Sequence, residues 1–240
     1  MKLIGITSIE GIIELDSGLH IGAGSDEMHI GGTDNPIIKH PNTGEPYIPG
    51  SSIKGKVRSL LELESGLMVH TNGEPVSATI FSNIKTPDEK QKCDKILKLF
   101  GTGASNINET NFGVTRVSFA DCNIDSNWLS EARKKNYVLT DVKSENTINR
   151  ISGTASNPRQ TERVPEGVKF NFKVSIKNFE EDNGDDLINY LLYGLKLLQL
   201  DAIGGNSSRG YGRFHFENLK EDGEDISTKF KNLEPFSKKG

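Results

Sequence analysis

Residues 48–58 include side chains suited to holding a phosphate. Ser51 and Ser52 supply caps at the start of a predicted helix, whose exposed amide groups and positive dipole end favour an anion. Lys54 and Arg58 are four residues apart and share one helical face, so both can reach a phosphate backbone from the same side. An ordinary serine cap with solvated cations is the alternative interpretation.

A second candidate is the glycine-rich stretch Gly204–Gly212. Walker and Rossmann phosphate loops follow a strand and open a helix, whereas this stretch follows a predicted helix and leads into a strand. We therefore do not expect a mononucleotide or dinucleotide site. Ser207, Arg209 and Tyr211 instead suit a nucleic-acid backbone, with the tyrosine ring available for stacking on a base or ribose. A tight turn between helix and strand is the alternative.

Two further candidates are His20 and Asp34. His20 lies where the first predicted strand ends and could hydrogen-bond a phosphate or ribose, although, taken in isolation, a structural histidine is the preferred interpretation. Asp34 lies in the segment 31–36, which by itself is good turn chemistry. The 5 histidines show none of the spacings typical of metal sites, so we do not expect a structural zinc ion.

A polar, basic arm occupies residues 140–166 and reads as two extended stretches around a turn. Ile148 and Ile151 could wedge against bases. Three arginines would give the arm a cationic side for phosphates: Arg150, Arg159 and Arg163. A solvated hairpin with ordinary surface charge is the alternative.

Length, charge and composition limit the class of protein to which these segments can belong. A chain of 240 residues can form one large domain or two small ones. The net charge is −4, from 29 Lys and Arg against 33 Asp and Glu, which neither requires nor excludes a polyanionic partner. No apolar run approaches about 18 residues, so we expect no membrane span. The amino-terminus does not read as a signal peptide, and 2 cysteines without zinc spacing favour a reducing cytoplasm.

The clearest elements form two strand-to-helix units. Residues 168–176 alternate strictly between apolar and polar, as a half-buried strand does, and residues 187–198 carry the stripe of an amphipathic helix. A short strand at 213–216 follows the glycine loop. Residues 3–15 predict a strand pair or one long bent strand, followed by a long loop at 18–50 and a helix that ends near Gly66. Two such units predict an α+β, split βαβ, ferredoxin-like core.

The remaining segments read as additions to this core. Residues 67–110 predict an insertion with a short helix that ends at Gly101, and residues 114–121 alternate weakly as a strand. The stretch from Asp222 onward has little periodicity, so we expect a loosely attached tail. The predicted organisation is one domain over 1–220 and a polar tail over 221–240.

Taken together, these segments resemble the repeated backbone subunit of type III-A (Csm) CRISPR–Cas effector complexes, a repeat-associated mysterious protein (RAMP). The glycine loop is shared with other RAMP subunits, whereas residues 145–150 and 157–163 narrow the resemblance to this one. The resemblance rests on seven segments: Gly18–Gly22, Asp34–Lys39, Ile48–Arg58, Leu99–Gly101, Glu145–Arg150, Asn157–Arg163 and Gly204–Gly212.

The resemblance implies a modified ferredoxin-like, RRM-like palm with inserted loops and a protruding thumb hairpin within about residues 140–166. It also implies four kinds of partner: a CRISPR RNA guide, a target RNA, further copies of the chain in a filament, and other effector-complex subunits. The implied RNA-binding residues are His20, Ser51, Ser52, Lys54, Lys56, Arg58, Arg150, Arg159, Arg163, Gly204, Gly205, Ser207, Arg209 and Tyr211.

The family also cleaves bound target RNA opposite each base that a thumb displaces. This implies that Asp34 is the catalytic residue and a candidate ligand of a divalent metal, with Mg²⁺ as the expected cofactor. As a hypothesis, base displacement frees the 2′-hydroxyl to attack the adjacent phosphate in line while Asp34 assists proton movement or places the metal. We match no second catalytic residue, so base, metal ligand and loop organiser all remain open roles for Asp34.

Three alternatives stay open. Another RAMP subunit, such as the type III-B backbone protein or a guide-processing endoribonuclease, shares the palm and the glycine loop. A non-catalytic RNA-binding scaffold would use the same surfaces without needing Asp34. A phosphometabolite-binding enzyme is disfavoured by the order of elements around the glycine loop.

Overall fold

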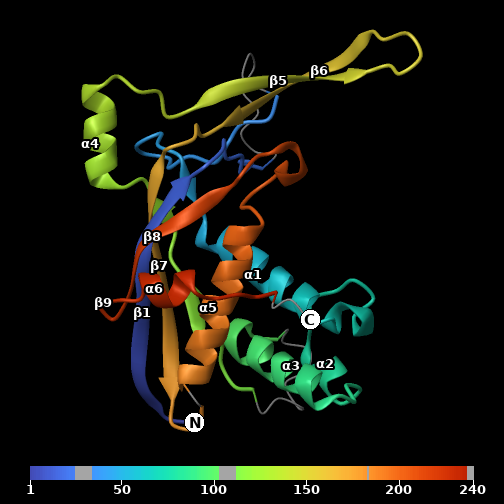
Figure 1. Ribbon diagram of the computed structural model, residues 1–240, viewed down its shortest axis with the longest axis vertical. Helices are drawn as coiled ribbons and strands as arrows, with labels where there is room; N and C mark the ends of the chain where they lie inside the picture. Colours follow the sequence, from blue (N-terminus) through green and yellow to red (C-terminus); the bar gives the residue numbers. More distant parts are fainter. Residues whose placement is uncertain (25–33, 103–111, 183, 237–240) are drawn as a thin grey trace.

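An antiparallel sheet and two long helices form the centre of the molecule (Figure 1). The computed structural model describes residues 1–24, 34–102, 112–182 and 184–236. The sheet has the order β3-β7-β1-β8-β9. Its strands are β1 (Leu3–Leu15), β3 (Val117–Phe119), β7 (Lys169–Phe179), β8 (Phe214–Glu221) and β9 (Glu224–Asp225).

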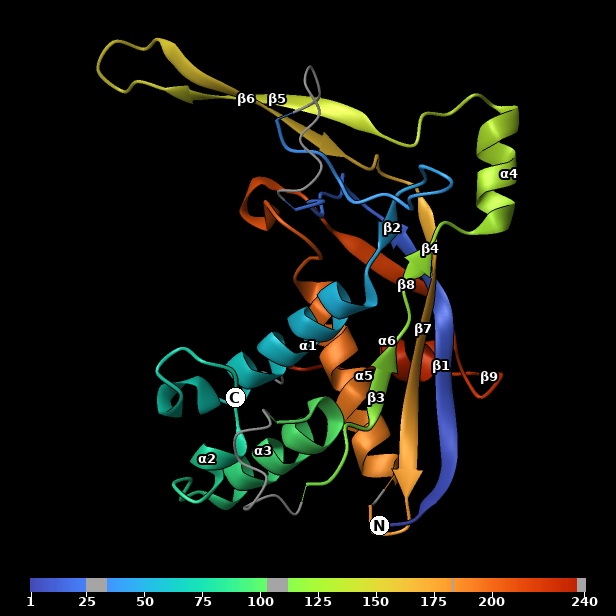
Figure 2. The same cartoon turned by 180° about the vertical axis from the view of Figure 1, so that it is seen from behind.

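Helices α1 (Gly50–Glu64) and α5 (Gly184–Leu200) cover one face of this sheet (Figures 1 and 2). The chain runs β1-α1-β3 and then β7-α5-β8, and the second unit inserts β7 beside β1. This is the order of a ferredoxin-like split βαβ, and it confirms the predicted α+β class.

The strand patterns explain why the sheet forms. Phe170, Phe172, Val174 and Ile176 are buried against the helices, while the intervening residues face the other side, as the alternation predicts. The segment 3–15 is one continuous strand rather than a strand pair, and its pairing with β8 shifts register between Glu10 and Ile12.

The start of α1 corrects the expectation that Ser51 and Ser52 cap the helix. Pro49 is the N-cap residue, and its own side chain makes no capping hydrogen bond. The Gly50 amide instead donates to Asp121 Oδ1 at 2.8 Å. A β-carbon at Gly50 would lie 2.4 Å from the Phe119 carbonyl oxygen, so only glycine allows the helix to start this close to the chain after β3.

The insertion after α1 is helical, as the apolar stripe near its end suggests. It contains η2 (Leu67–His70), α2 (Ala78–Phe81) and α3 (Pro87–Phe100), which ends before Gly101 as predicted. A helix that the sequence did not reveal, α4 (Ser126–Lys134), follows the short pair β2 (Tyr47–Ile48) and β4 (Cys122–Asn123). Its N-cap is Asp125, whose side chain accepts from the Trp128 amide.

The basic arm forms the predicted hairpin. Strands β5 (Asp141–Ile148) and β6 (Ala155–Arg163) pair with each other in an antiparallel ladder, as a two-stranded sheet of their own. The hairpin projects sideways beyond the helices, away from α4 (Figure 1). A projecting hairpin buries little of its outer part, and every residue from Asn146 to Gln160 is exposed.

The end of the chain packs on the sheet, which corrects the expectation of a loosely attached tail. Helix α6 (Ser227–Lys231) follows β9, and Ile226 and Phe230 are buried. The Phe230 ring meets Phe216 of β8 edge-on, with centroids 5.5 Å apart. None of the helices in the described ranges is long and apolar enough to cross a membrane.

Candidate functional site

The segment that begins at Asp34 lies alongside the base of the hairpin. Asp34 Oδ2 accepts from the Gln160 amide at 3.1 Å, although the two residues are 126 positions apart. Asn35 bridges Thr161, accepts from the Glu162 amide at 3.0 Å and donates from its side chain to the Gln160 carbonyl at 3.3 Å. The hairpin backbone therefore fixes Asp34, whose side chain remains exposed.

His20 also contacts the base of the hairpin, at Glu162 of β6. Its Nδ1 lies 2.7 Å from the Glu162 carbonyl oxygen, and its own carbonyl accepts from the Gly205 amide at 2.9 Å. A β-carbon on Gly204, which has a positive φ, would lie 2.4 Å from that carbonyl oxygen, so the close approach requires glycine. The structure thus brings together three of the predicted segments: the His20 loop, the Asp34 loop and the glycine loop.

The glycine loop is also tied to the hairpin through charged groups. Arg209 Nη1 lies 2.8 Å from Glu145 Oε2, and this contact, more than any other, holds the pKa of the Glu145 carboxyl below its ordinary value. Tyr211 is only 1% exposed, and Lys143 lies over its ring at 4.7 Å. This burial leaves no ring face for stacking on a base, so Tyr211 supports the loop from beneath, while Ser207 is exposed on it.

The three hairpin arginines differ in their surroundings. Arg163 makes two hydrogen bonds of 2.9 Å with the carboxylate of Asp141, and these raise the pKa of its guanidinium. Gly18 leaves room for the Arg163 side chain, because a β-carbon there would lie 2.6 Å from Arg163 Cδ. Arg150 and Arg159 are exposed, and neither forms a salt bridge with another described residue.

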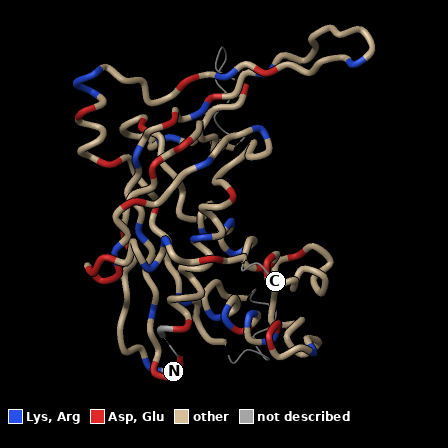
Figure 3. The backbone as a smooth tube through the Cα atoms, in the orientation of Figure 1, with Lys and Arg blue, Asp and Glu red and all other residues tan. Residues whose placement is uncertain are grey.

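Charge is unevenly distributed along the hairpin (Figure 3). Acidic and basic residues alternate near its base, whereas Arg150 is the one charged residue between Asn146 and Pro158. Ile148 and Ile151, the predicted wedge residues, are 55% and 100% exposed. The outer hairpin therefore presents apolar side chains and one cation, a combination suited to contact with bases and a phosphate.

The cations of α1 are largely committed to carboxylates. Arg58 Nε lies 2.8 Å from Glu62 Oε1, and its Nη2 donates to the Val76 carbonyl. Lys56 pairs with Asp201, at the end of α5, at 2.6 Å. Partial burial and then the charge of Arg58 lower the pKa of Lys54. Arg58 thus has a structural role in joining α1 to the insertion.

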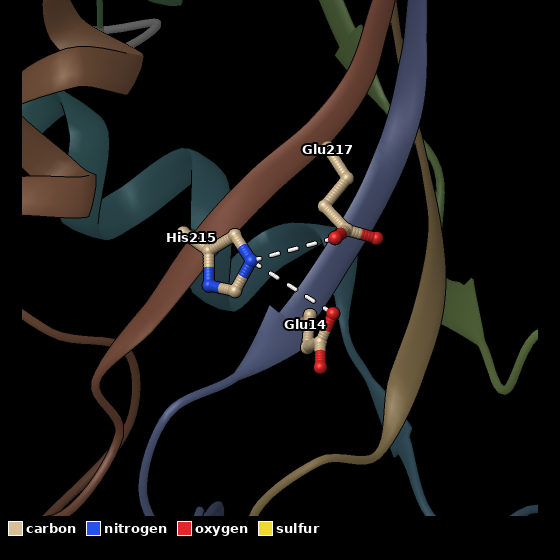
Figure 4. Close-up of side chains that lie close together, drawn as sticks. All are labelled: Glu14, His215 and Glu217. Carbon is tan, nitrogen blue, oxygen red and sulfur yellow. Dashed lines mark ion pairs between the residues drawn. The ribbon is translucent and has the colours of Figure 1, made fainter.

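A group that the sequence did not reveal lies on β1 and β8 (Figure 4). Among the described residues, Glu14, His215 and Glu217 are the one set of side chains close enough to share a metal ion. Lys169 already contributes a cation here, at 2.7 Å from Glu14 Oε2 and 2.6 Å from Glu217 Oε2. Among the described residues, Asp34 is not part of a set of side chains close enough to share a metal ion.

Glu162 is a further residue of this site that the sequence pattern did not single out. It is 8% exposed, and its carboxylate faces the loop that follows Asp34. Burial opposes ionisation, but hydrogen bonds from Lys39 and the Ile37 amide outweigh it, so the pKa of Glu162 lies below its ordinary value. Its place within the 157–163 segment was the available signal, but its main partners, Ile37 and Lys39, lie more than a hundred residues away.

Comparisons with known proteins extend these observations. A family model described as the RAMP superfamily matches residues 12–215. A protein of Methanothermobacter thermautotrophicus named "CRISPR system Cms endoribonuclease Csm3" is 39% identical over 225 residues, covering 88% of this chain and 84% of the relative. The protein of the same name from Methanocaldococcus jannaschii is 38% identical over 223 residues, covering 92% and 82%.

One solved structure is similar along most of its length. It is a chain of the "Csm3-Csm4 subcomplex in the type III-A CRISPR-Cas interference complex". The TM-score is 0.55 with 29% sequence identity, and the match covers 92% of this chain and 80% of that one.

Proposed function

This chain belongs to the RAMP superfamily and is an endoribonuclease of the Csm3 type, a backbone subunit of a type III-A complex, and from this we propose that it lines up in several copies along a CRISPR RNA and cuts the bound target RNA at regular intervals. The ferredoxin-like palm and the hairpin are the parts that such a subunit needs. The neighbours in that assembly are further copies of the chain and other effector subunits.

One observation carries the proposal: Asp34 is held by the hairpin. Its carboxylate accepts from the Gln160 amide of β6, next to the His20 loop and the glycine loop. A hairpin that displaces one base from a guide–target duplex would therefore place this carboxylate beside the sugar of the displaced nucleotide. The exposed, largely uncharged outer hairpin supports that use.

The chemistry follows from this geometry. Displacing a base frees its ribose to rotate, so that the 2′-hydroxyl can attack the adjacent phosphate in line. The attack forms a 2′,3′-cyclic phosphate and breaks the bond to the 5′-oxygen of the next nucleotide, which leaves as a 5′-hydroxyl. Asp34 accepts the proton of the 2′-hydroxyl directly or orients the group that does.

A divalent metal ion, Mg²⁺ in our proposal, would have one protein ligand at this site, the carboxylate of Asp34. One protein carboxylate with phosphate oxygens and water is a donor set that Mg²⁺ accepts, and Asp34 offers one exposed carboxylate. Such an ion would stabilise the negative charge on the phosphate during the attack.

We place the protein in the cytoplasm, because Cys93 and Cys122 are free and buried thiols, which suits a reducing compartment.

The test is a cleavage assay on the assembled complex. Wild-type and Asp34→Ala complexes, purified with guide and partner subunits, receive labelled complementary RNA with and without Mg²⁺. We expect evenly spaced cuts from the wild type and a loss of at least about 100-fold in rate for the variant, with target binding unchanged. The same cuts at the same rate in Asp34→Ala would overturn the assignment of Asp34.

The leading alternative is an RNA-binding scaffold without cleavage. It is supported by the metal-ligating groups of the described residues, because Asp34 is not in a set of side chains close enough to share a metal ion. Tight target binding without cuts by the wild type, in any divalent metal, would establish the scaffold.

A further inference from the structure

Among the residues that the structure describes, Glu162 is the one hairpin carboxylate whose side chain contacts the Asp34 loop. Its Oε2 accepts from the Ile37 amide at 3.0 Å and its Oε1 from Lys39 Nζ at 2.6 Å. Its backbone amide donates to the Asn35 carbonyl at 3.0 Å, and its carbonyl oxygen lies 2.7 Å from His20 Nδ1. One residue of β6 therefore contacts both the Asp34 loop and the His20 loop.

The contacts of Glu162 directly follow, along β6, the contact that holds Asp34 itself. The amide of Gln160 holds the Asp34 carboxylate, Thr161 bridges Asn35, and Glu162 holds Ile37 and Lys39. Residues 34–39 are thus attached to three consecutive residues of the hairpin strand. Without the Glu162 carboxylate, the remaining attachments of residues 34–39 to the hairpin are the contacts of Asp34 and Asn35 with Gln160 and with the backbone of residues 161–162.

The free-energy cost of burying a charge indicates that the Glu162 carboxylate stabilises this arrangement of loop and hairpin. A carboxylate that is about nine-tenths buried is strongly destabilising unless it is paired and hydrogen-bonded. Glu162 meets that requirement mainly with Lys39 and the Ile37 amide of the Asp34 loop, and the Thr140 side chain just before β5 adds a smaller contribution. Surface loops without such an anchor are among the least ordered parts of proteins.

We propose that Glu162 is a positioning residue for RNA cleavage, which holds the Asp34 loop at a fixed place on the hairpin. The inference rests on the proposed function and deepens it. Asp34 and the base-displacing hairpin then move as one body, so the cut position is set by where the hairpin enters the duplex. A loop anchored elsewhere on the palm could shift relative to the displaced base and would cut less uniformly.

The experiment compares Glu162→Gln and Glu162→Ala with the wild type in the assembled complex. We expect kcat for cleavage to fall about 10-fold for Gln and about 100-fold for Ala, as is typical when an outer contact of a reacting group is removed. The KM for target RNA should not change. The Mg²⁺ concentration for half-maximal rate should rise, and cuts should spread to neighbouring phosphates, neither of which a general loss of stability would cause.

The matched control is Asp182→Asn. Asp182 forms a buried ion pair with Arg116, both side chains being 3% exposed, just beyond the end of β7 that lies away from the hairpin (Figure 1). The Asp182→Asn substitution should lower the melting temperature of the complex at least as much as Glu162→Gln does. It should leave kcat, the Mg²⁺ dependence and the cut positions unchanged.

The outcomes separate the two claims. If the wild type cuts and Glu162→Gln assembles and cuts with unchanged rate, Mg²⁺ dependence and positions, the positioning role is wrong while the proposed function stands. The role is equally wrong if Asp182→Asn reproduces the whole Glu162→Gln phenotype. If the wild type binds target but makes no cuts, the proposed function fails and the positioning role fails with it.

Discussion

At the scale of single residues, several cations of the candidate RNA surface already have carboxylate partners. Arg209, Arg163 and Arg58 pair with Glu145, Asp141 and Glu62, and their side chains are 45%, 29% and 20% exposed. Exposed ion pairs contribute little to stability, whereas buried pairs are costly to break. A phosphate can therefore replace Glu145 at Arg209 most easily, and Arg58 is the least available of the three.

His215 gives a prediction about pH. Partial burial lowers the pKa of its imidazole, but the hydrogen bond to Asp16 and the charges of Glu14 and Glu217 outweigh burial, so the pKa is raised. Lys169, paired with both glutamates, is the cation facing this group. A raised pKa in the folded state means that protonated His215 stabilises the fold below the ordinary histidine value near 6.5, and this contribution is lost as pH rises through the folded pKa.

The measurement is the melting temperature of wild type and His215→Gln at pH 6 and pH 8. Relative to the variant, the wild type should lose stability between the two values, because only the wild type releases a proton from this site. A pH dependence that is identical in the two proteins would show that His215 does not contribute in this way.

At the scale of elements, helix α1 joins the palm to the insertion through one buried carboxylate. Glu62 Oε1 accepts from Arg58 Nε at 2.8 Å and from the Val76 amide at 3.0 Å. The phosphate-binding role predicted for Arg58 would therefore require breaking a contact that holds the start of the insertion. Lys54, on the same helix, has no salt bridge to another described residue.

Arg58→Ala should accordingly destabilise the protein by about 2–4 kcal/mol, since it leaves the Glu62 carboxylate buried without a cation. Lys54→Ala, the matched control on the same helix, should change the free energy of unfolding by less than about 0.5 kcal/mol. Chemical denaturation of both variants measures the difference. Equal stability of the two variants would contradict the structural role of Arg58.

At the scale of the whole molecule, the chain after β8 completes the core. Phe230 of α6 is 4% exposed and packs on Phe216, whereas Phe236, a few residues later, is 69% exposed. Phe230→Ala should cost about 2–4 kcal/mol in the free energy of unfolding, because it leaves a cavity against the sheet. Phe236→Ala should have almost no effect. Thermal melting of the two variants distinguishes a docked segment from a dispensable tail.

The sequence by itself determined the elements whose signal is local. Alternation over 168–176 predicted β7, the apolar stripes predicted α1 and α5, and the polar arm at 140–166 predicted the hairpin. Two strand-to-helix units in that order were enough for the ferredoxin-like class, because side-chain periodicity depends only on neighbours along the chain. The family followed from seven short segments and was confirmed by the comparisons.

The tertiary structure alone decided how the candidate site is assembled. Asp34 reads as a turn residue until the Gln160 amide reaches it from 126 positions away, and Glu162 reads as surface charge until Ile37 and Lys39 cover it. The helix start at Pro49, the burial of Tyr211 and the docking of α6 depend in the same way on distant partners. Local patterns specify which element forms, but a hydrogen bond or an ion pair is specified by both partners, and only folding brings them together.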